Sequence, residues 1–264
     1  MPRLAANLDF LFTDRPLEAR FDAAAACGFP GIEMLFADRM PAPALRAALD
    51  AAGLETALIN IAVDDWAAGG RGCAALPGQE DRFRRALIES VERAVAVGAR
   101  RLHVLAGIPE TGTDLAYARA SYMRNLHEAA ETAAAAGIVA TIEAINPRDM
   151  PGYFLADPDE AAAIVREIDH PALKVQFDLY HTQITRGDLT RRLDAQLPLI
   201  GHVQIAGVPD RAEPDQGEIA PAHLLDRLDT LGYDGWVGLE YRPRGRTEDG
   251  LGWAAPWGIR SPAD

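Results

Sequence analysis

The chain has 264 residues, of which 48% are hydrophobic, so it can bury a sizeable core as one large α/β domain or as two small ones. Its 39 acidic and 26 basic residues give a net charge of −13, which disfavours binding to nucleic acids and to anionic membrane surfaces. Two cysteines are too few for a disulfide framework or a structural zinc site, which fits a reducing cytoplasm. The N-terminal stretch "MPRLAANLDFLF" has one early base and no uninterrupted apolar run before Asp9, and no other segment reaches the length of a membrane span, so we expect a soluble cytoplasmic protein.

A unit recurs along the chain: an Ala-rich helical stretch, a glycine and a short apolar run, as in "AAAACGFPGIEMLF" and "AAAAGIVATIEAIN". The glycines lie where a helix needs a residue that tolerates positive φ at its end, and they are Gly28, Gly53, Gly98, Gly137 and Gly232. In chain order the apolar runs predict eight strands, at Leu4–Asn7, Gly31–Leu35, Thr56–Asn60, Arg101–Leu105, Val139–Glu143, Leu173–Asp178, Ile200–Ile205 and Trp236–Glu240. The longest periodic stretches between them, Asp81–Val97 and Asp114–Ala136, predict helices.

Strict alternation of strands and helices predicts a parallel sheet, and eight such units in a chain of this length are typical of a (β/α)8 TIM barrel. A doubly wound open sheet is the alternative, although the sequence has neither a Gly-x-Gly-x-x-Gly motif after the first strand nor a Gly-Lys-Ser/Thr phosphate loop. No Pro/Ser-rich linker divides the chain. We therefore expect a single domain over residues 1–264, with the barrel at about 4–252 and an irregular tail at 253–264.

Polar side chains occupy the carboxyl ends of the last four predicted strands, where the loops of a barrel open and chemistry takes place. They are Glu143, Asp178, Gln204 and Glu240, and each is about one βα unit from the next. A single acid after a strand is often a helix N-cap or a solvated loop residue, but four oxygen-bearing side chains at matching positions predict a shared site. Because three carboxylates brought this close would repel one another, we expect a cation among them, and oxygen ligands suit Mg²⁺ or Mn²⁺.

Two histidines lie beside these residues. His181 follows Asp178 by three positions and is predicted to donate to substrate or to a ligand oxygen. His202 shares a strand face with Gln204, and the pattern leaves open whether it supports the site or is a core histidine. The remaining histidines are interpreted as structural or surface residues: His103, His127, His170 and His223.

The predicted third loop, residues 63–78, is long for a connection from strand to helix and carries Trp66 and Arg71 among glycines. It is either an ordinary surface excursion or a lid in which Trp66 excludes water and Arg71 binds a carboxylate. Arg211, after the seventh strand, is a second candidate for binding that anion.

Seven stretches together resemble the hydroxypyruvate isomerases, a family of the xylose isomerase-like barrel superfamily: "ANLDFLF", "GFPGIEMLF", "DDWAAGGRGCAALPG", "IEAINPRDMPGY", "QFDLYHTQ", "GHVQIAGVPDRAEPDQGEI" and "GWVGLEYRPRG". The resemblance implies that Glu143 and Glu240 are the proton donor and acceptor pair and also bind the divalent ion, with Asp178 and Gln204 completing the metal site. Less specifically, His181 and Arg211 resemble the substrate contacts of epimerase relatives. The implied reaction interconverts hydroxypyruvate and tartronate semialdehyde through an enediolate, with Mg²⁺ or Mn²⁺ and with no nucleotide or redox cofactor.

Other functions stay open. An isomerase of a four-carbon 2-oxo acid of the 2-oxo-tetronate type, or a ketose 3-epimerase, would use the same proton transfer, although epimerases usually place His where this chain has Gln204. An apurinic endonuclease needs several zinc ions and many histidines, which six histidines and a charge of −13 disfavour. A barrel that only binds a ligand has no physical reason to keep clustered acids. We expect a small anionic keto-acid or sugar-like substrate, and exposed barrel helices favour a homodimer or homotetramer.

Overall fold

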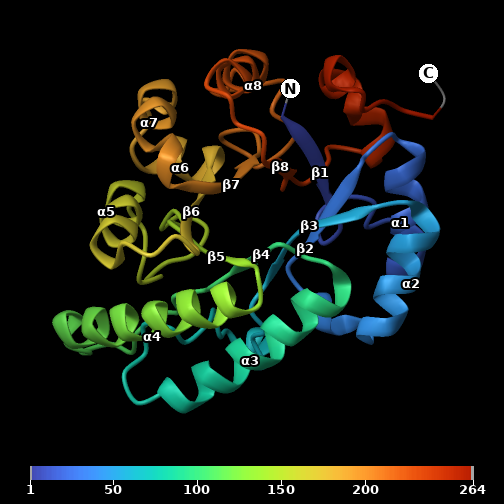
Figure 1. Cartoon of the computed structure of the whole chain (residues 1–264). Coiled ribbons are helices and arrows are strands. Elements are labelled where there is room, and N and C mark those ends of the chain that lie inside the picture. The colour runs from blue at the N-terminus through green and yellow to red at the C-terminus, as the bar shows by residue number, and fades with distance from the viewer. Residues whose placement is uncertain (1, 263–264) are drawn as a thin grey trace.

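The computed structural model describes residues 2–262; residues 1, 263 and 264, which belong to the predicted domain and its tail, lie outside the described residues. Eight parallel strands pair in chain order, and the last pairs with the first to close a barrel. Helices surround this barrel (Figure 1). The predicted (β/α)8 TIM barrel is therefore confirmed, and the closed strand order excludes an open doubly wound sheet.

The strands begin and end within two residues of the predicted positions: β1 (Arg3–Asn7), β2 (Gly31–Met34), β3 (Glu55–Asn60), β4 (Arg101–His103), β5 (Val139–Glu143), β6 (Leu173–Asp178), β7 (Ile200–Ile205) and β8 (Trp236–Leu239). The α-helices are α1 (Leu17–Ala26), α2 (Ala42–Ala52), α3 (Glu80–Val97), α4 (Leu115–Ala135), α5 (Pro158–Ile168), α6 (Leu179–Thr185), α7 (Leu189–Gln196) and α8 (Pro221–Thr230). Short 3₁₀ segments are η1 (Ala37–Arg39), η2 (Trp66–Ala68), η3 (Leu197–Leu199) and η4 (Thr247–Trp257).

The turns between helices and strands follow from local sequence. Gly53 and Gly98 end α2 and α3 with φ of 67° and 73°, a conformation that side chains bearing a Cβ disfavour. Asp114 begins α4, because its carboxylate accepts a hydrogen bond from the backbone N–H of Ala116. The five predicted glycine positions all have positive φ, as expected for turns that connect a helix to the next strand of the barrel.

The amino ends of the strands are closed by a small apolar group, Ala5, Ala57 and Trp236, which we call the floor. Trp236 is the first residue of β8 and is 5% exposed. A Cβ at Gly31 of β2 would overlap its indole ring, so the absence of a side chain there makes room for it. The guanidinium of Arg3 stacks 3.7 Å from the centroid of the indole ring and covers it from solvent.

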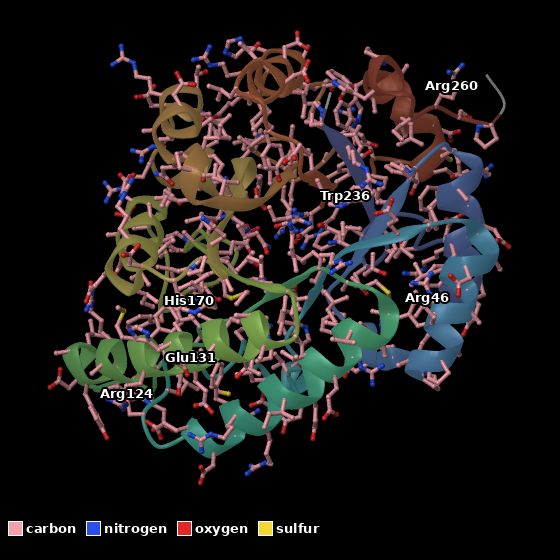
Figure 2. All side chains as sticks on the ribbon, in the orientation of Figure 1. Arg46, Arg124, Glu131, His170, Trp236 and Arg260 are labelled. Atoms are coloured by element: carbon pink, nitrogen blue, oxygen red, sulfur yellow. The ribbon has the colours of Figure 1, made fainter. Side chains whose placement is uncertain are left out.

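Charged side chains lie mainly on the outside of the ring of helices. Arg124 and Glu131 project from the outer face of α4, whereas Trp236 lies at the barrel (Figure 2). Within residues 2–262, no helix combines the length and the apolarity needed to cross a bilayer.

Candidate active site

The four predicted strand-end residues meet at the carboxyl end of the barrel. Glu143 and Asp178 are the last residues of β5 and β6, Gln204 lies one residue before the end of β7, and Glu240 directly follows β8. Each is at most 7% exposed, and Asp178 is in register with Gln204. Parallel strands thus bring to one place four side chains that are far apart in the sequence.

Two amide side chains connect the two glutamates. The Nε2 of Gln204 donates to Glu240 Oε2 and, at 2.9 Å, to Oε1 of Glu33 on β2. The Nε2 of Gln176 on β6 donates to Gln204 Oε1 at 2.7 Å and to Glu143 Oε2 at 3.2 Å. The two amides bond to each other, and each also donates to a buried carboxylate, so the network restrains the positions of Glu143 and Glu240.

Glu143, Asp178 and His181 form a cluster that fits a metal ion, and we call it the rim cluster. Within the described residues, Glu143 Oε1 and Asp178 Oδ2 are buried without a hydrogen-bond partner. Both oxygens lie 3.8 Å from His181 Nε2, and the three candidate ligand atoms lie within 4.8 Å of one another. Buried carboxylate oxygens without partners are costly, and a divalent cation would satisfy them.

The acids of the site are held in surroundings that disfavour their charge. Burial, followed by the charges of Asp178 and Glu240, raises the pKa of Glu143 well above its ordinary value. Burial also raises the pKa of Asp178 to about 6 and that of Glu240 to about 8, with Arg211 opposing both shifts. These carboxyls therefore hold protons more readily than ordinary acids, and a bound cation would favour their ionised forms.

His181 is oriented by Asn146, a residue that the sequence analysis did not single out. Asn146 Oδ1 accepts from the backbone N–H groups of Arg148 and Asp149, so its Nδ2 faces His181 Nδ1, at 2.6 Å. The backbone N–H of Asn146 also points at this Nδ1, at 3.4 Å. Nδ1 is therefore an acceptor, and burial lowers the pKa of His181 well below its ordinary value, so the neutral ring carries its proton on Nε2.

Arg211 lies in the site but is engaged by acidic side chains. Its guanidinium pairs with Glu240 Oε1 and, at 3.1 Å, with Asp149 Oδ2. The rings of Phe10 and Tyr180 lie 4.9 and 5.1 Å from it. With 8% exposure, Arg211 neutralises its carboxylate partners and has little capacity left for another anion.

A cavity of about 390 Å³ opens over these residues, and its lining includes Arg71, Arg211 and Arg242 together with Glu143, His181 and Glu240. Arg71 stacks 4.2 Å from the ring of Trp66 and donates to the carbonyl oxygens of Trp66 and Gly70. Trp66 also lines the cavity and packs edge-on against Phe36, with the ring centroids 5.0 Å apart. Arg242, which the sequence analysis did not predict, is exposed and has no ion-pair partner among residues 2–262.

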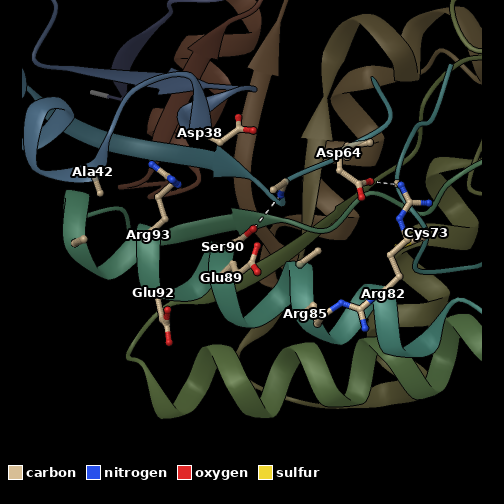
Figure 3. A pocket seen from close by; sticks show the side chains of 15 residues that line it. Asp38, Ala42, Asp64, Cys73, Arg82, Arg85, Glu89, Ser90, Glu92 and Arg93 are labelled. Atoms are coloured by element: carbon tan, nitrogen blue, oxygen red, sulfur yellow. Dashed lines mark hydrogen bonds and ion pairs between the residues drawn. The ribbon is translucent and has the colours of Figure 1, made fainter. Parts of the chain in front are cut away.

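The loop that carries Trp66 is attached to the outside of the barrel. Asp64 and Asp65 both pair with Arg82 of α3. Figure 3 shows Asp64 and Arg82 beside a separate hollow of about 660 Å³ that lies over α3. No residue of the rim cluster lines this hollow, whereas Glu143 and His181 line the cavity at the barrel mouth.

Sequence reasoning set His103 aside as a structural or surface residue, but it lines the cavity with its Nε2 3.6 Å from Glu143 Oε2. Burial, followed by the charge of His202, lowers the pKa of His103 to about 3, so the ring is neutral. His202, for which the sequence left open a supporting or a core role, contacts Oε2 of Glu33 through its Nε2 at 2.7 Å. A signal for Glu33 was present in the sequence, because a carboxylate in the middle of the apolar run "GIEM" needs buried partners.

Comparisons with known proteins agree with this architecture. The family model described as xylose isomerase-like TIM barrel matches residues 21–257. The chain is 51% identical to a 2-oxo-tetronate isomerase of Cupriavidus necator, over 97% of this chain and 99% of that protein. It is 37% identical to a hydroxypyruvate isomerase of Escherichia coli, over 97% and 100% of the two chains. A crystal structure described as an AP endonuclease, family 2, from Brucella melitensis superposes with a TM-score of 0.95 at 43% identity, covering 97% of this chain and 99% of that one.

Proposed function

Because this chain belongs to the xylose isomerase-like TIM barrel family, we propose that it is an isomerase that moves a carbonyl group between adjacent carbons of a short 2-oxo acid. Hydroxypyruvate is the proposed substrate, and tartronate semialdehyde is its product. The observation that carries the proposal is the pair Glu143 and Glu240, two buried acids with raised pKa values that line one cavity beside the rim cluster.

The reaction is a balanced transfer of protons within one molecule. One glutamate removes a proton from C3, which leaves an enediolate, and a proton is then delivered to C2. The C3 hydroxyl gives up its proton and becomes the carbonyl, while the former C2 carbonyl oxygen takes up a proton and becomes the hydroxyl. Burial disfavours the charge on Glu240 whereas a bound cation favours it, and a carboxyl under these opposing influences is suited to both taking and giving a proton. Since the substrate and the product have the same overall oxidation state, the reaction needs no nucleotide or redox cofactor.

The residues present fit a divalent ion, which we propose is Mg²⁺ or Mn²⁺ held by Glu143, Asp178, Gln204 and Glu240. When bound, such an ion supplies Lewis-acid stabilisation of the charge that develops on the substrate oxygens. Because Nε2 of His181 carries the ring proton, only Glu143 and Asp178 of the rim cluster would hold the ion, and the Nε2–H of His181 is placed to donate to a substrate oxygen. This role of His181 is supported by Asn146, whose backbone N–H and Nδ2 both face Nδ1 of the ring and so keep the ring proton on Nε2.

Recognition of the substrate carboxylate is proposed for Arg71 and Arg242. Arg211 was expected to bind this anion, but its pairs with Glu240 and Asp149 support a different task, which is to hold Glu240 in place. Arg71 keeps part of its guanidinium free at the mouth, and the side chain of Arg242 has no ion pair within the described residues. Trp66, against which Arg71 stacks, would exclude water from the bound substrate.

A four-carbon 2-oxo acid is the second candidate substrate. Two relatives named 2-oxo-tetronate isomerase are 51% and 42% identical to this chain, against 37% for the Escherichia coli hydroxypyruvate isomerase. DNA repair is a weaker candidate, although the Brucella structure is named as an AP endonuclease, because the net charge of −13 opposes a phosphate backbone. We also propose that the protein is cytoplasmic, which the two buried free cysteines support. We further propose that it forms a homodimer or a homotetramer.

The test compares hydroxypyruvate, 2-oxo-tetronate, the neutral ketoses erythrulose and fructose, and a DNA duplex with one abasic site. Each is incubated with the purified chain, with and without Mg²⁺ or Mn²⁺. We expect the highest turnover for hydroxypyruvate and dependence on the metal. Faster turnover of 2-oxo-tetronate would select the second candidate, whereas rates dominated by a neutral ketose, or cleavage of the duplex, would contradict a 2-oxo acid as substrate.

A further inference from the structure

Glu33, a residue of β2 that the proposed chemistry does not use, is a fully buried carboxylate surrounded by N–H donors. Its Oε1 accepts from Asn7 Nδ2 at 3.0 Å and from Gln204 Nε2 at 2.9 Å. Its Oε2 lies 2.7 Å from His202 Nε2. Because both oxygens of Glu33 are engaged by these neighbours, it acts on the site through them.

The barrel leaves space for this carboxylate. Glu33 on β2 and Gln204 on β7 are not on adjacent strands, since β8 and β1 lie between them. A Cβ at Gly238 of β8 would overlap both the carboxylate carbon and the oxygens of Glu33. The missing side chain at Gly238 therefore lets Glu33 reach across the barrel interior to Gln204.

The contacts of Gln204 distinguish the two ends of its amide. Its Nε2 faces two carboxylates, Glu33 and Glu240, and its Oε1 faces the Nε2 of Gln176. Exchanging the two ends would press an oxygen against two carboxylate oxygens and an N–H₂ group against another N–H₂ group. Gln176 is itself tied to Glu143, so the amide of Gln204 has a single acceptable orientation.

We propose that Glu33 is a positioning residue that, together with Glu240, holds the Gln204 amide in this orientation and so presents its oxygen toward Gln176 and Glu143. This inference rests on the proposed function, in which Gln204 is a ligand of the divalent ion. A carbonyl oxygen has two lone pairs, so Oε1 can accept from Gln176 and still bind a cation, whereas an amide nitrogen cannot. Residues that orient a ligand from behind commonly change metal affinity by about 10- to 100-fold.

The experiment measures Mn²⁺ affinity by calorimetry on the metal-free protein, without substrate. Glu33→Met removes the acceptor at similar length and is expected to weaken Mn²⁺ binding by about 10- to 100-fold. Glu33→Gln is the matched control. It keeps one oxygen for Gln204, and His202 can accept from the new amide by changing its tautomer, so its affinity should stay close to wild type.

A double-mutant cycle separates positioning from a general structural effect. If Glu33 acts through Gln204, Glu33→Met added to Gln204→Ala should weaken Mn²⁺ binding no further than Gln204→Ala alone. Should Glu33→Met fail to fold, Gly238→Ala replaces it, because its Cβ displaces the same carboxylate while leaving Glu33 and its charge in place. Circular dichroism and thermal unfolding check that every variant is folded.

The outcomes are distinct. Weaker binding that disappears in the Gln204→Ala background supports the proposal. Wild-type affinity in the folded Glu33→Met or Gly238→Ala protein, or an effect that persists undiminished in the Gln204→Ala background, overturns it while leaving the proposed function intact. Absence of Mn²⁺ binding to the wild-type protein contradicts the proposed metal-assisted function and this inference with it.

Discussion

The two ends of the barrel are built from the same strands but differ in what they bury: a mainly apolar group at the floor and polar, charged side chains at the mouth. At the floor, Trp236 fills the space that Gly31 leaves open and packs with Ala5 and Ala57, while the Arg3 guanidinium stacks on its indole. At the mouth, Glu33 fills the space that Gly238 leaves open, and its partners are polar and linked to two further buried acids. The floor is therefore held by apolar packing and ring stacking, whereas the mouth keeps buried oxygens without partners among the described residues.

One strand shows the difference over five residues. β8 begins with Trp236 at the floor and is followed directly by Glu240 at the mouth, with Gly238 between them. Burial of the indole stabilises the fold, whereas burial of the Glu240 carboxyl raises its pKa to about 8 and so opposes its ionisation. We expect substitutions at the two ends to separate stability from chemistry.

The largest effect is expected for the two glutamates at the mouth. Glu143→Gln and Glu240→Gln each remove a proton acceptor of nearly the same shape, so turnover of hydroxypyruvate should fall by about 10²- to 10⁴-fold. Exchange of the substrate C–H with deuterated water, followed by NMR, should fall with it. Glu131→Gln, on the exposed face of α4, is the control and should leave both rates unchanged. Exchange that survives in both variants at the mouth would exclude these residues as the bases.

At the floor the opposite result is expected. Trp236→Ala removes a nearly buried indole that no other side chain can replace, and should lower the free energy of unfolding by about 3–5 kcal/mol. Denaturant titration measures this loss. Turnover per folded molecule, measured at low temperature, should stay close to wild type because no polar contact of the mouth involves the indole. A folded Trp236→Ala protein without activity would show that the two ends are coupled.

A bound metal ion should stabilise the mouth in a way that depends on pH. The pKa of Asp178 is raised to about 6 and that of Glu240 to about 8, above the ordinary values of 3.8 and 4.5. Because the unfolded chain releases these protons first, the stability of the metal-free protein should fall as pH rises from about 4 to about 8. Mn²⁺ at 100 times its dissociation constant should then add about 2.7 kcal/mol at pH 8.

Thermal unfolding with Mn²⁺ or with a chelator measures this difference. Trp236→Phe, altered only at the floor, is the matched control and should respond to Mn²⁺ as the wild type does. Asp178→Asn should lose most of the response, since it removes a charged member of the rim cluster. An equal shift in Asp178→Asn and wild type would place the ion elsewhere.

Most of the fold could be predicted because its signals are local. Many of the helices end at a glycine with positive φ or shortly before one, and each strand is a short apolar run, so neighbouring residues carry the information. The four strand-end residues could be predicted for a related reason: chain spacing places the ends of parallel strands at the same edge. What was missed depends on contacts across the barrel. Glu33 meets Gln204 over 171 positions in the chain, and no spacing rule links them.

Local geometry accounts for the other differences. Asn146 acts on His181 because its loop folds back on itself, with its Oδ1 accepting from two backbone N–H groups. His103 is in the third and last position of β4, a strand so short that the alternation is too brief to show which way a side chain faces. Arg211 has a φ of 55°, a backbone conformation that the sequence does not signal for an arginine.

The smallest effect is expected for a substitution that tests whether the mouth has two parts, a buried part proposed for chemistry and an exposed part proposed to recognise charge. Arg242→Gln removes an exposed guanidinium, so about 1.4 kcal/mol, or a tenfold rise in KM for hydroxypyruvate, is a reasonable upper expectation for a partly solvated ion pair. The value of kcat should hardly change, and any slow turnover of the neutral ketose erythrulose should not change at all. Raising the salt concentration should weaken binding to the wild type and shrink its advantage over Arg242→Gln, because exposed charges are screened. If Arg242→Gln lowered kcat instead, charge recognition and chemistry would share residues, and the division of the mouth would be wrong.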